Sequence, residues 1–320
     1  MQEDGGKGSG PLRVGVIGVG YLGRLHAQKI SSFPDVRFVG VCDVNAAHGK
    51  AVAQECGTGF FERRGRLLAE TDAVSIAVPT TEHYRVAMDA MRAGVHVLLE
   101  KPITASLREA RTLVREAEER NLVFQIGHVE RFNPAVREAA SILTEPRFIE
   151  CHRLGPFGGR GTDVDVVLDL MIHDIDLILS FVRSPVTRIH AVGVPVVSSN
   201  IDIANARLTF ASGCVANITA SRVSAKKQRK IRIFQEDAYV SMDFVEHSIQ
   251  IFRRTYPHGT HDLPEIAGEL LETEKGDSLR DEIRSFLDCV AGGTAPRVSG
   301  VEGLAALEMA FRILRKMRRR

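Results

Sequence analysis

A glycine-rich turn near the N-terminus constrains the fold of this chain more than any other feature. An apolar strand pattern leads directly into Gly18, Gly20 and Gly23, which form a G-x-G-x-x-G sequence at the start of a helical pattern. Gly18 permits a tight turn, Gly20 lets a pyrophosphate approach the backbone, and Gly23 lets the helix pack closely on its strand. The free N–H groups of such a helix start, here at Tyr21 and Leu22, point toward the phosphates of a dinucleotide.

An aspartate follows the turn at an informative distance. A second apolar run, Val36 to Cys42, ends at Asp43, about 20 residues after the last glycine. A carboxylate there accepts hydrogen bonds from the ribose hydroxyls of NAD and repels the 2′-phosphate of NADP. No arginine follows in residues 44–46, so we predict NAD rather than NADP, with His48 and Lys50 as the nearest basic groups. The alternative, an ordinary turn followed by a surface aspartate, does not explain the order of strand, turn, helix, strand and acid.

The size and charge of the chain limit the class of protein. With 320 residues, 44% of them hydrophobic, the chain is long enough for about two globular domains. The formal net charge is only +2 and charges of both signs are interspersed, so we expect neither a nucleic-acid nor a membrane partner. The basic run at residues 315–320 is typical of a solvated helix end.

The cysteines indicate a reducing compartment. They are odd in number and scattered, with no C-x-x-C pair: Cys42, Cys56, Cys151, Cys214 and Cys289. We therefore expect buried thiols in a cytoplasmic protein. No apolar run is long enough to span a bilayer, and residues 1–11 are polar and glycine-rich, which predicts a disordered tail.

The order of strand and helix patterns changes near residue 127. Residues 12–127 alternate short apolar strands with amphipathic helices, which predicts a dinucleotide-binding Rossmann domain with a doubly wound parallel sheet. Residues 128–320 contain longer alternating strands with hairpin-like loops. They predict an α+β domain with a large, mostly antiparallel open sheet, for substrate binding and oligomerisation. Helices are expected in this second part near residues 165–182, 278–291 and 301–318.

A lysine follows one predicted strand of the first domain. The strand His96–Leu99 is followed by Glu100, Lys101 and Pro102. Ligands of doubly wound folds bind at the carboxyl edge of the sheet, which is where Lys101 is expected. Pro102 restricts the backbone of Lys101 to extended conformations, so the ammonium group is held in place. A surface lysine at a strand end is the ordinary alternative.

Several ionisable side chains interrupt the apolar helix predicted at residues 165–182. At about 100° per residue, Asp169, His173 and Asp176 lie within an arc of roughly 60°. Burying charge is costly, and an Asp and a His four residues apart suit a carboxylate that orients an imidazole for proton transfer near neutral pH. The alternatives are a core histidine with satisfied hydrogen bonds or half of a metal site. No further ligands have convincing spacing, so we predict no metal.

Three motifs in this order resemble the Gfo/Idh/MocA family of nicotinamide-dependent sugar and cyclitol oxidoreductases. They are the glycine turn, the E-K-P segment at residues 100–102 and the D-x-x-x-H-x-x-D pattern at residues 169–176, and the resemblance extends from Leu12 to about Arg318. It implies that Lys101, Asp169 and His173 are the catalytic residues. It also implies further cofactor contacts in the segments that follow two strands: Pro79, Thr80, His83, Glu100 and Lys101.

Two segments, residues 127–134 and 169–176, indicate which branch of this family the chain resembles. Together they resemble the branch that oxidises C3 of UDP-N-acetylglucosamine for the amino sugar of some bacterial lipid A. The alternatives within the family are dehydrogenases of other sugars, of inositol or of UDP-uronic acids, because the fold does not separate them. A non-catalytic regulator that binds the dinucleotide is a further alternative, which the complete set of catalytic residues disfavours.

Polar side chains near the predicted crevice suit a nucleotide sugar. Arg131 and Asn133 follow a strand of the first sheet, where a guanidinium group can pair with phosphate and an amide with sugar hydroxyls. Arg153 and Arg160 precede the catalytic helix and are candidates for the diphosphate, or else exposed arginines without a ligand. Lys101 and His173 complete the expected substrate contacts.

The residues suggest a hydride-transfer mechanism. A hydride leaves a sugar carbon for the nicotinamide, His173 takes the hydroxyl proton, Asp169 orients His173, and Lys101 stabilises the alkoxide. The roles of Lys101 and His173 can be exchanged. Because the exposed face of the second sheet must be covered, we expect a homodimer or homotetramer.

Overall fold

The structure is a computed structural model that describes residues 10–158, 164–255, 265–272 and 276–317. It divides into two compact units. One consists of Met1–Gly127 with Leu279–Val301, and the other of His128–Ser278 with Glu302–Arg320. Most of the tail expected at residues 1–11 lies outside the described residues.

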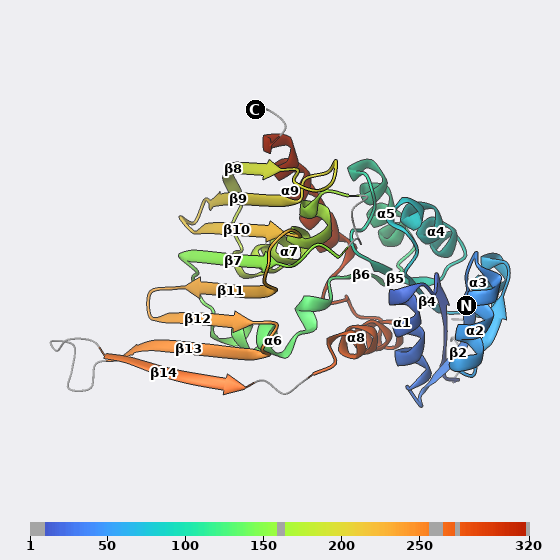
Figure 1. Cartoon of the computed structure of the whole chain (residues 1–320). Helices are drawn as coiled ribbons and strands as arrows, with labels where there is room; N and C mark the ends of the chain where they lie inside the picture. The colour runs from blue at the N-terminus through green and yellow to red at the C-terminus, as the bar shows by residue number, and fades with distance from the viewer. Residues whose placement is uncertain (1–9, 159–163, 256–264, 273–275, 318–320) are drawn as a thin grey trace. The chain divides into compact units, whose positions relative to one another are not determined.

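The first unit contains a six-stranded parallel sheet. Its strands are β1 (Leu12–Ile17), β2 (Val36–Cys42), β3 (Gly59–Phe61), β4 (Ala73–Ile76), β5 (His96–Glu100) and β6 (Phe124–Gly127). Their order is β3-β2-β1-β4-β5-β6, so strand addition reverses direction between β1 and β4. The glycine turn joins β1 to α1 at this reversal, which is where doubly wound folds bind their ligands (Figure 1). The predicted Rossmann sheet is confirmed.

Helices connect these strands. They are α1 (Tyr21–Ser31), α2 (Ala46–Glu55), α3 (Arg64–Glu70), α4 (Thr80–Arg92) and α5 (Leu107–Glu119). Ser106 caps the start of α5, because its hydroxyl accepts a hydrogen bond of 3.4 Å from the backbone N–H of Glu109.

A late segment of the chain also belongs to the first unit. Helix α8 (Ser278–Gly292) places Ile283, Phe286 and Leu287 in the apolar cluster that contains Val14 of β1. We expected residues 128–320 to form one domain, so the return of residues 279–301 to the first unit is a correction. The apolar face of α8 shows in the sequence that the helix is buried, but it does not show against which sheet.

The second unit contains an eight-stranded, mostly antiparallel sheet, as predicted. Its strands are β7 (Phe148–Leu154), β8 (Val186–Val194), β9 (Ile203–Phe210), β10 (Val215–Ser221), β11 (Gln228–Phe234), β12 (Ala238–Asp243), β13 (Ser248–Thr255) and β14 (Glu265–Glu272). Their order is β14-β13-β12-β11-β7-β10-β9-β8, and β7 and β10 form the parallel pair. Strand β14 was not predicted from the sequence, because its side chains at residues 265–270 are exposed and show no core pattern.

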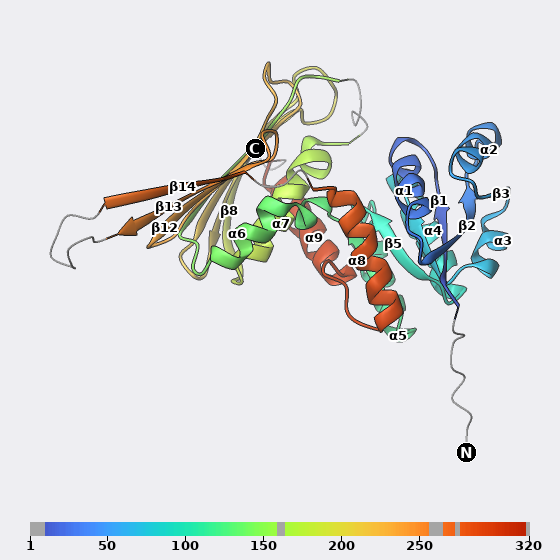
Figure 2. The ribbon, with the colours of Figure 1, turned by 90° about the horizontal axis from the view of Figure 1, so that it is seen from below.

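Helices cover one face of this sheet. Helices α6 (Pro134–Ile142), α7 (Ile172–Phe181) and α9 (Gly300–Met317) lie on the same side of it (Figure 2). Their apolar residues form one cluster with the inward residues of the strands. Two short elements complete the unit, a 3-10 turn η1 (Val129–Phe132) and a π-helical segment η2 (Val167–Met171) that precedes α7. Among the described residues, no helix is both long and apolar enough to cross a membrane.

Candidate active site

Each glycine of the first turn has its own steric role. Gly18 has φ +80°, and a Cβ there would lie 2.7 Å from Cγ1 of Val78. A Cβ at Gly23 would lie 1.8 Å from the carbonyl oxygen of Gly18. Nothing lies within 4 Å of a Cβ built at Gly20, so open space remains beside that backbone. The turn thus combines close packing at two glycines with free access at the third, as a pyrophosphate site requires.

Asp43 holds this turn from the end of β2. Its two carboxylate oxygens accept hydrogen bonds from the backbone N–H of Val19 at 2.7 Å and of Asn45 at 2.8 Å. At the start of α1, Tyr21 and Leu22 are exposed. The carboxylate therefore lies beside the glycine turn, at the end of the neighbouring strand, which fits the expected contact with the ribose of NAD.

The open space at Gly20 makes a sharp prediction. We expect Gly20→Ala to leave the melting temperature within about 2 °C, because the new methyl group meets no protein atom. The same methyl group is expected to raise the Kd for NAD about tenfold, because it occupies the approach of the pyrophosphate. Calorimetric titration with NAD measures the effect. Gly65→Ala in α3, which also meets no atom, is the matched control and should change neither quantity. Equal NAD affinity of both variants would contradict the expectation.

A buried hydrogen-bond network holds Glu100 at the end of β5. Its Oε1 lies 3.1 Å from Nε2 of His26, whose Nδ1 lies 2.7 Å from the hydroxyl of Ser75. Its Oε2 accepts a 3.2 Å hydrogen bond from the backbone N–H of Lys101. Burial by itself would raise the pKa of Glu100, but the hydrogen bond and charge of His26 and the charge of Lys101 lower it overall. Glu100 therefore stays ionised and fixes the backbone of the predicted catalytic lysine.

His83 links two loops of the same sheet edge. Its ring nitrogens lie 2.8 Å from the carbonyl oxygen of Pro102 and 2.9 Å from that of Val78. Burial lowers the pKa of His83 despite these two hydrogen bonds. The ring is fully buried, so the structure gives His83 a role in positioning the loops, while Pro79 and Thr80 lie at the start of α4. The peptide bond between Lys101 and Pro102 is cis.

In the second unit, Asp169 and His173 lie on an irregular helix. Asp169 belongs to the π-helical segment η2, whereas His173 lies in the first turn of α7. The predicted stripe assumed a regular α-helix, so its angle does not describe Asp169, which lies in a wider turn. π-helical turns are frequent at functional sites. The ring of His173 stands edge-on to that of His128, with centroids 6.5 Å apart.

Two arginines that we expected to contact substrate form ion pairs with carboxylates of the second unit. The guanidinium group of Arg131 donates hydrogen bonds of 2.7 and 3.1 Å to the carboxylate of Asp176. Arg153, only 3% exposed, donates to Asp174 at 2.8 Å and to Glu130 at 2.9 Å. Burial by itself would lower the pKa of Arg153, but the charges of these two carboxylates raise it overall. Both arginines brace α7, and the charge of Arg153 is already balanced, which corrects its expected availability to a diphosphate.

Of the two other residues predicted to contact substrate, the structure describes Asn133 but not Arg160. The side chain of Asn133 accepts a 3.0 Å hydrogen bond from the backbone N–H of Ala135 and thereby caps α6. Arg160 lies outside the described residues. Among the described residues, no group of three or more His, Cys, Asp or Glu side chains is placed to hold a metal ion.

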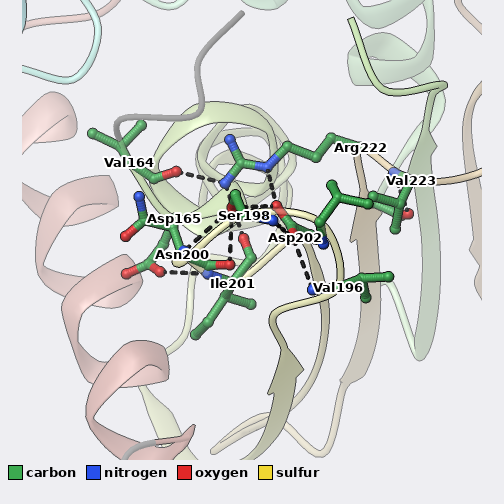
Figure 3. A network of polar contacts seen from close by, with 11 residues as sticks. Val164, Asp165, Val196, Ser198, Asn200, Ile201, Asp202, Arg222 and Val223 are labelled. Carbon is green, nitrogen blue, oxygen red and sulfur yellow. Dashed lines mark hydrogen bonds and ion pairs between the residues drawn. The ribbon is translucent and has the colours of Figure 1, made fainter. Parts of the chain in front are cut away.

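A carboxylate that sequence reasoning missed organises the loop before β9. Asp202 is fully buried and accepts hydrogen bonds from the backbone N–H groups of Val196, Val197 and Ser198 at 2.7–2.9 Å. The hydroxyl of Ser198 donates to its other oxygen, and Nε of Arg222 lies 3.1 Å from that oxygen (Figure 3). No spacing rule in the sequence identifies this cluster, because it depends on how the loop turns back.

The same cluster reaches the start of the helix that carries Asp169. Arg222 donates hydrogen bonds to the carbonyl oxygens of Val164 and Ile201, and the backbone N–H of Ile201 donates to the carboxylate of Asp165 at 2.9 Å (Figure 3). The backbone N–H of Asp169 in turn donates to the carbonyl oxygen of Asp165 at 3.2 Å. The position of Asp169 thus depends on a chain of contacts that begins at a buried ion pair.

Sequence models of known families match both parts of the chain. Residues 12–128 match an oxidoreductase family with an NAD-binding Rossmann fold, and residues 141–241 match the C-terminal domain of Gfo/Idh/MocA proteins. The chain belongs to the Gfo/Idh/MocA oxidoreductase family. The prediction of an NAD-dependent dehydrogenase with a Rossmann domain is confirmed.

Relatives in this family cover nearly the whole chain. The UDP-N-acetylglucosamine 3-dehydrogenase of Acidithiobacillus ferrooxidans is 42% identical over 94% of this chain and 96% of its own. A solved structure of that enzyme has a TM-score of 0.90 at 40% identity, with 96% of this chain and 97% of that chain covered. The scyllo-inositol 2-dehydrogenase (NAD(+)) of Bacillus subtilis is 25% identical, over 94% of this chain and 92% of its own. A scyllo-inositol dehydrogenase from Lactobacillus casei with bound NAD(H) and scyllo-inositol shares the fold, with a TM-score of 0.81 at 20% identity and 97% of both chains covered.

Proposed function

We propose that this enzyme oxidises the C3 hydroxyl of UDP-N-acetylglucosamine with NAD to give the 3-keto sugar and NADH. The observation that carries the proposal is the 42% identity, over almost the full length of both chains, with an enzyme of that name. The inositol dehydrogenases among the relatives are only 23–29% identical to this chain. They define the alternative substrate class.

The residues of this chain fit NAD and the chemistry that NAD supplies. NAD, when bound, accepts a hydride at C4 of its nicotinamide ring. The glycine turn and Asp43 suit its pyrophosphate and ribose. As the C3–H bond of the sugar breaks, His173 takes the hydroxyl proton, Asp169 orients His173, and Lys101 stabilises the developing alkoxide. The carbonyl forms when the proton and the hydride have both left.

A substrate panel tests this proposal. We expect NADH formation with UDP-N-acetylglucosamine to have a kcat/KM at least about 100-fold above that with UDP-glucuronic acid, free N-acetylglucosamine or myo-inositol. Sugar nucleotide with deuterium at C3 should transfer the label to the reduced cofactor, which mass spectrometry detects. A higher kcat/KM for myo-inositol, or reduced cofactor without label, would contradict the proposal.

We also propose that the enzyme is a homo-oligomer of the cytoplasm. Aromatic rings line the outward face of the second sheet, and neighbouring centroids are 4.6–5.7 Å apart from Phe148 through Phe234 and Tyr239 to Phe252. A second copy of the chain that covers this face would remove the rings from water. All five cysteines are free thiols, which suits a reducing compartment. Light scattering on the purified protein tests the assembly, and a monomeric mass would contradict it.

A further inference from the structure

A small cationic pocket lies beside Asp169 within the second unit. Its volume is about 220 Å³, and four basic side chains line it together with Asp169: Arg153, Arg222, Lys227 and Arg229. Sites that enclose a whole drug-sized ligand measure roughly 300–1,000 Å³. The pocket therefore suits one charged part of a larger ligand.

Two of these four cations are balanced by the protein itself. Arg153 faces the carboxylates of Asp174 and Glu130. Arg222 is paired with Asp202 and donates to two backbone carbonyl groups, so its guanidinium group is directed into the cluster of Figure 3. These two arginines form a fixed wall of the pocket.

The other two cations of the pocket, Arg229 and Lys227, lie on or next to β11. Arg229 stands on β11 directly opposite Arg153 on β7, in antiparallel register. It is half-buried, and burial and then the charge of Arg153 lower the pKa of Arg229, although the nearby carboxylates of Glu130, Asp174 and Asp169 act in the opposite direction. Lys227 is exposed and lies immediately before the first residue of the same strand. Within the described part of the chain, neither Arg229 nor Lys227 forms a salt bridge. Because burial and Arg153 together outweigh these carboxylates, an additional anion in the pocket would stabilise the charged form of Arg229.

We propose that Arg229 and Lys227 bind the diphosphate of the nucleotide-sugar substrate in this pocket. The inference rests on the proposed function, which supplies a substrate with a diphosphate. That diphosphate is attached to C1 of the sugar, two carbons from the C3 that is oxidised. A diphosphate site must therefore lie within one sugar ring of the catalytic groups, and Asp169 lines this pocket. The planar guanidinium group of Arg229 suits paired phosphate oxygens, and Lys227 adds a mobile charge.

Variants of one strand provide the test. Calorimetric titrations compare the wild type, Arg229→Met and Lys227→Met, each saturated with NAD so that the glycine turn is occupied. The ligands are UDP, uridine and inorganic pyrophosphate. Lys230→Met is the control, because it removes one positive charge from β11 on the opposite face of the sheet. Thermal unfolding checks that each variant is folded, and Lys227→Met alters only an exposed side chain.

We expect the Kd for UDP and for pyrophosphate to rise at least tenfold in Arg229→Met and about threefold to tenfold in Lys227→Met. Uridine binding should be unchanged, and Lys230→Met should differ from the wild type by less than about twofold. With UDP-N-acetylglucosamine, KM should rise in the two pocket variants while kcat stays within about threefold.

The outcomes separate this inference from the proposed function. If the wild type oxidises UDP-N-acetylglucosamine and the KM of both pocket variants stays within about twofold of its value, the pocket is not the diphosphate site and the proposed function stands. If the wild type does not oxidise this substrate but Arg229→Met still loses pyrophosphate affinity, the pocket stands as an anion site and the proposed substrate is wrong. Equal loss of affinity in Lys230→Met would overturn the inference, because the effect would then be one of overall charge.

Discussion

Replacing Lys101 by methionine is expected to lower kcat for the proposed substrate by about 10²–10⁴. Methionine keeps the length and the apolar stem of the side chain but removes the cation that stabilises the alkoxide. NAD affinity should stay within about threefold, because we assign the pyrophosphate contacts to the glycine turn. Steady-state absorbance of NADH gives kcat, and fluorescence titration with NADH gives the cofactor affinity.

Lys316→Met is the matched control for this prediction. It removes the same charge from the exposed last turn of α9 and should leave kcat and cofactor affinity unchanged. A kcat of Lys101→Met within about threefold of the wild type would show that the ammonium group takes no part in the chemistry. A parallel loss of NAD affinity would instead assign the lysine to cofactor binding.

Replacing Asp202 by asparagine is expected to lower the free energy of unfolding at pH 7 by about 3–5 kcal/mol, because it leaves the buried Arg222 without its carboxylate. Burial by itself would raise the pKa of Asp202, but the hydroxyl of Ser198 and the backbone N–H groups of Ser198, Val196 and Val197 lower it overall. A carboxylate with a lowered pKa in the folded state stabilises the fold fully above its unfolded pKa of about 3.9. That contribution is lost as the pH falls below this value.

Urea denaturation followed by circular dichroism at several pH values measures this effect. The difference between the wild type and Asp202→Asn should be constant from pH 7 to pH 5 and should shrink by up to about 1.4 kcal/mol per pH unit below about pH 3.9. Asp243→Asn is the control, since Asp243 accepts two backbone hydrogen bonds in the turn after β12 and makes no buried ion pair among the described residues. It should cost less than about 1 kcal/mol. A difference for Asp202→Asn that grows toward low pH would refute the assignment.

The fold of the first unit could be predicted from local sequence motifs. Gly18, Gly20 and Gly23 specify a turn by steric rules that depend on few neighbours, and the turn specifies the strand and helix on either side of it. The parallel sheet follows from alternation alone. The residues that form this sheet could be predicted because its strands and helices alternate along the chain. The sequence could not predict that α8 packs in the first unit. An amphipathic pattern indicates that one face of a helix is buried, but not which surface covers that face.

The predicted site was less complete than the predicted fold because ion pairs are long-range. Arg131 and Arg153 were predicted to contact substrate, but each forms an ion pair with a carboxylate of α7 that lies 45 or 21 residues away in the sequence. No periodicity distinguishes an arginine that meets a carboxylate of its own chain from one that meets a phosphate. Arg229 had a weak signal in the basic run at residues 226–230, which precedes and enters a strand.

The return of residues 279–301 to the first unit determines how this protein can be divided. A fragment that stops at Gly127 lacks Ile283, Phe286 and Leu287, which are each at most 2% exposed in the intact chain. Each of these side chains contributes about 1.5–3 kcal/mol when buried. Truncation after the Rossmann strands would therefore yield an aggregation-prone piece, and an isolated cofactor module would need α8 fused back through an engineered linker.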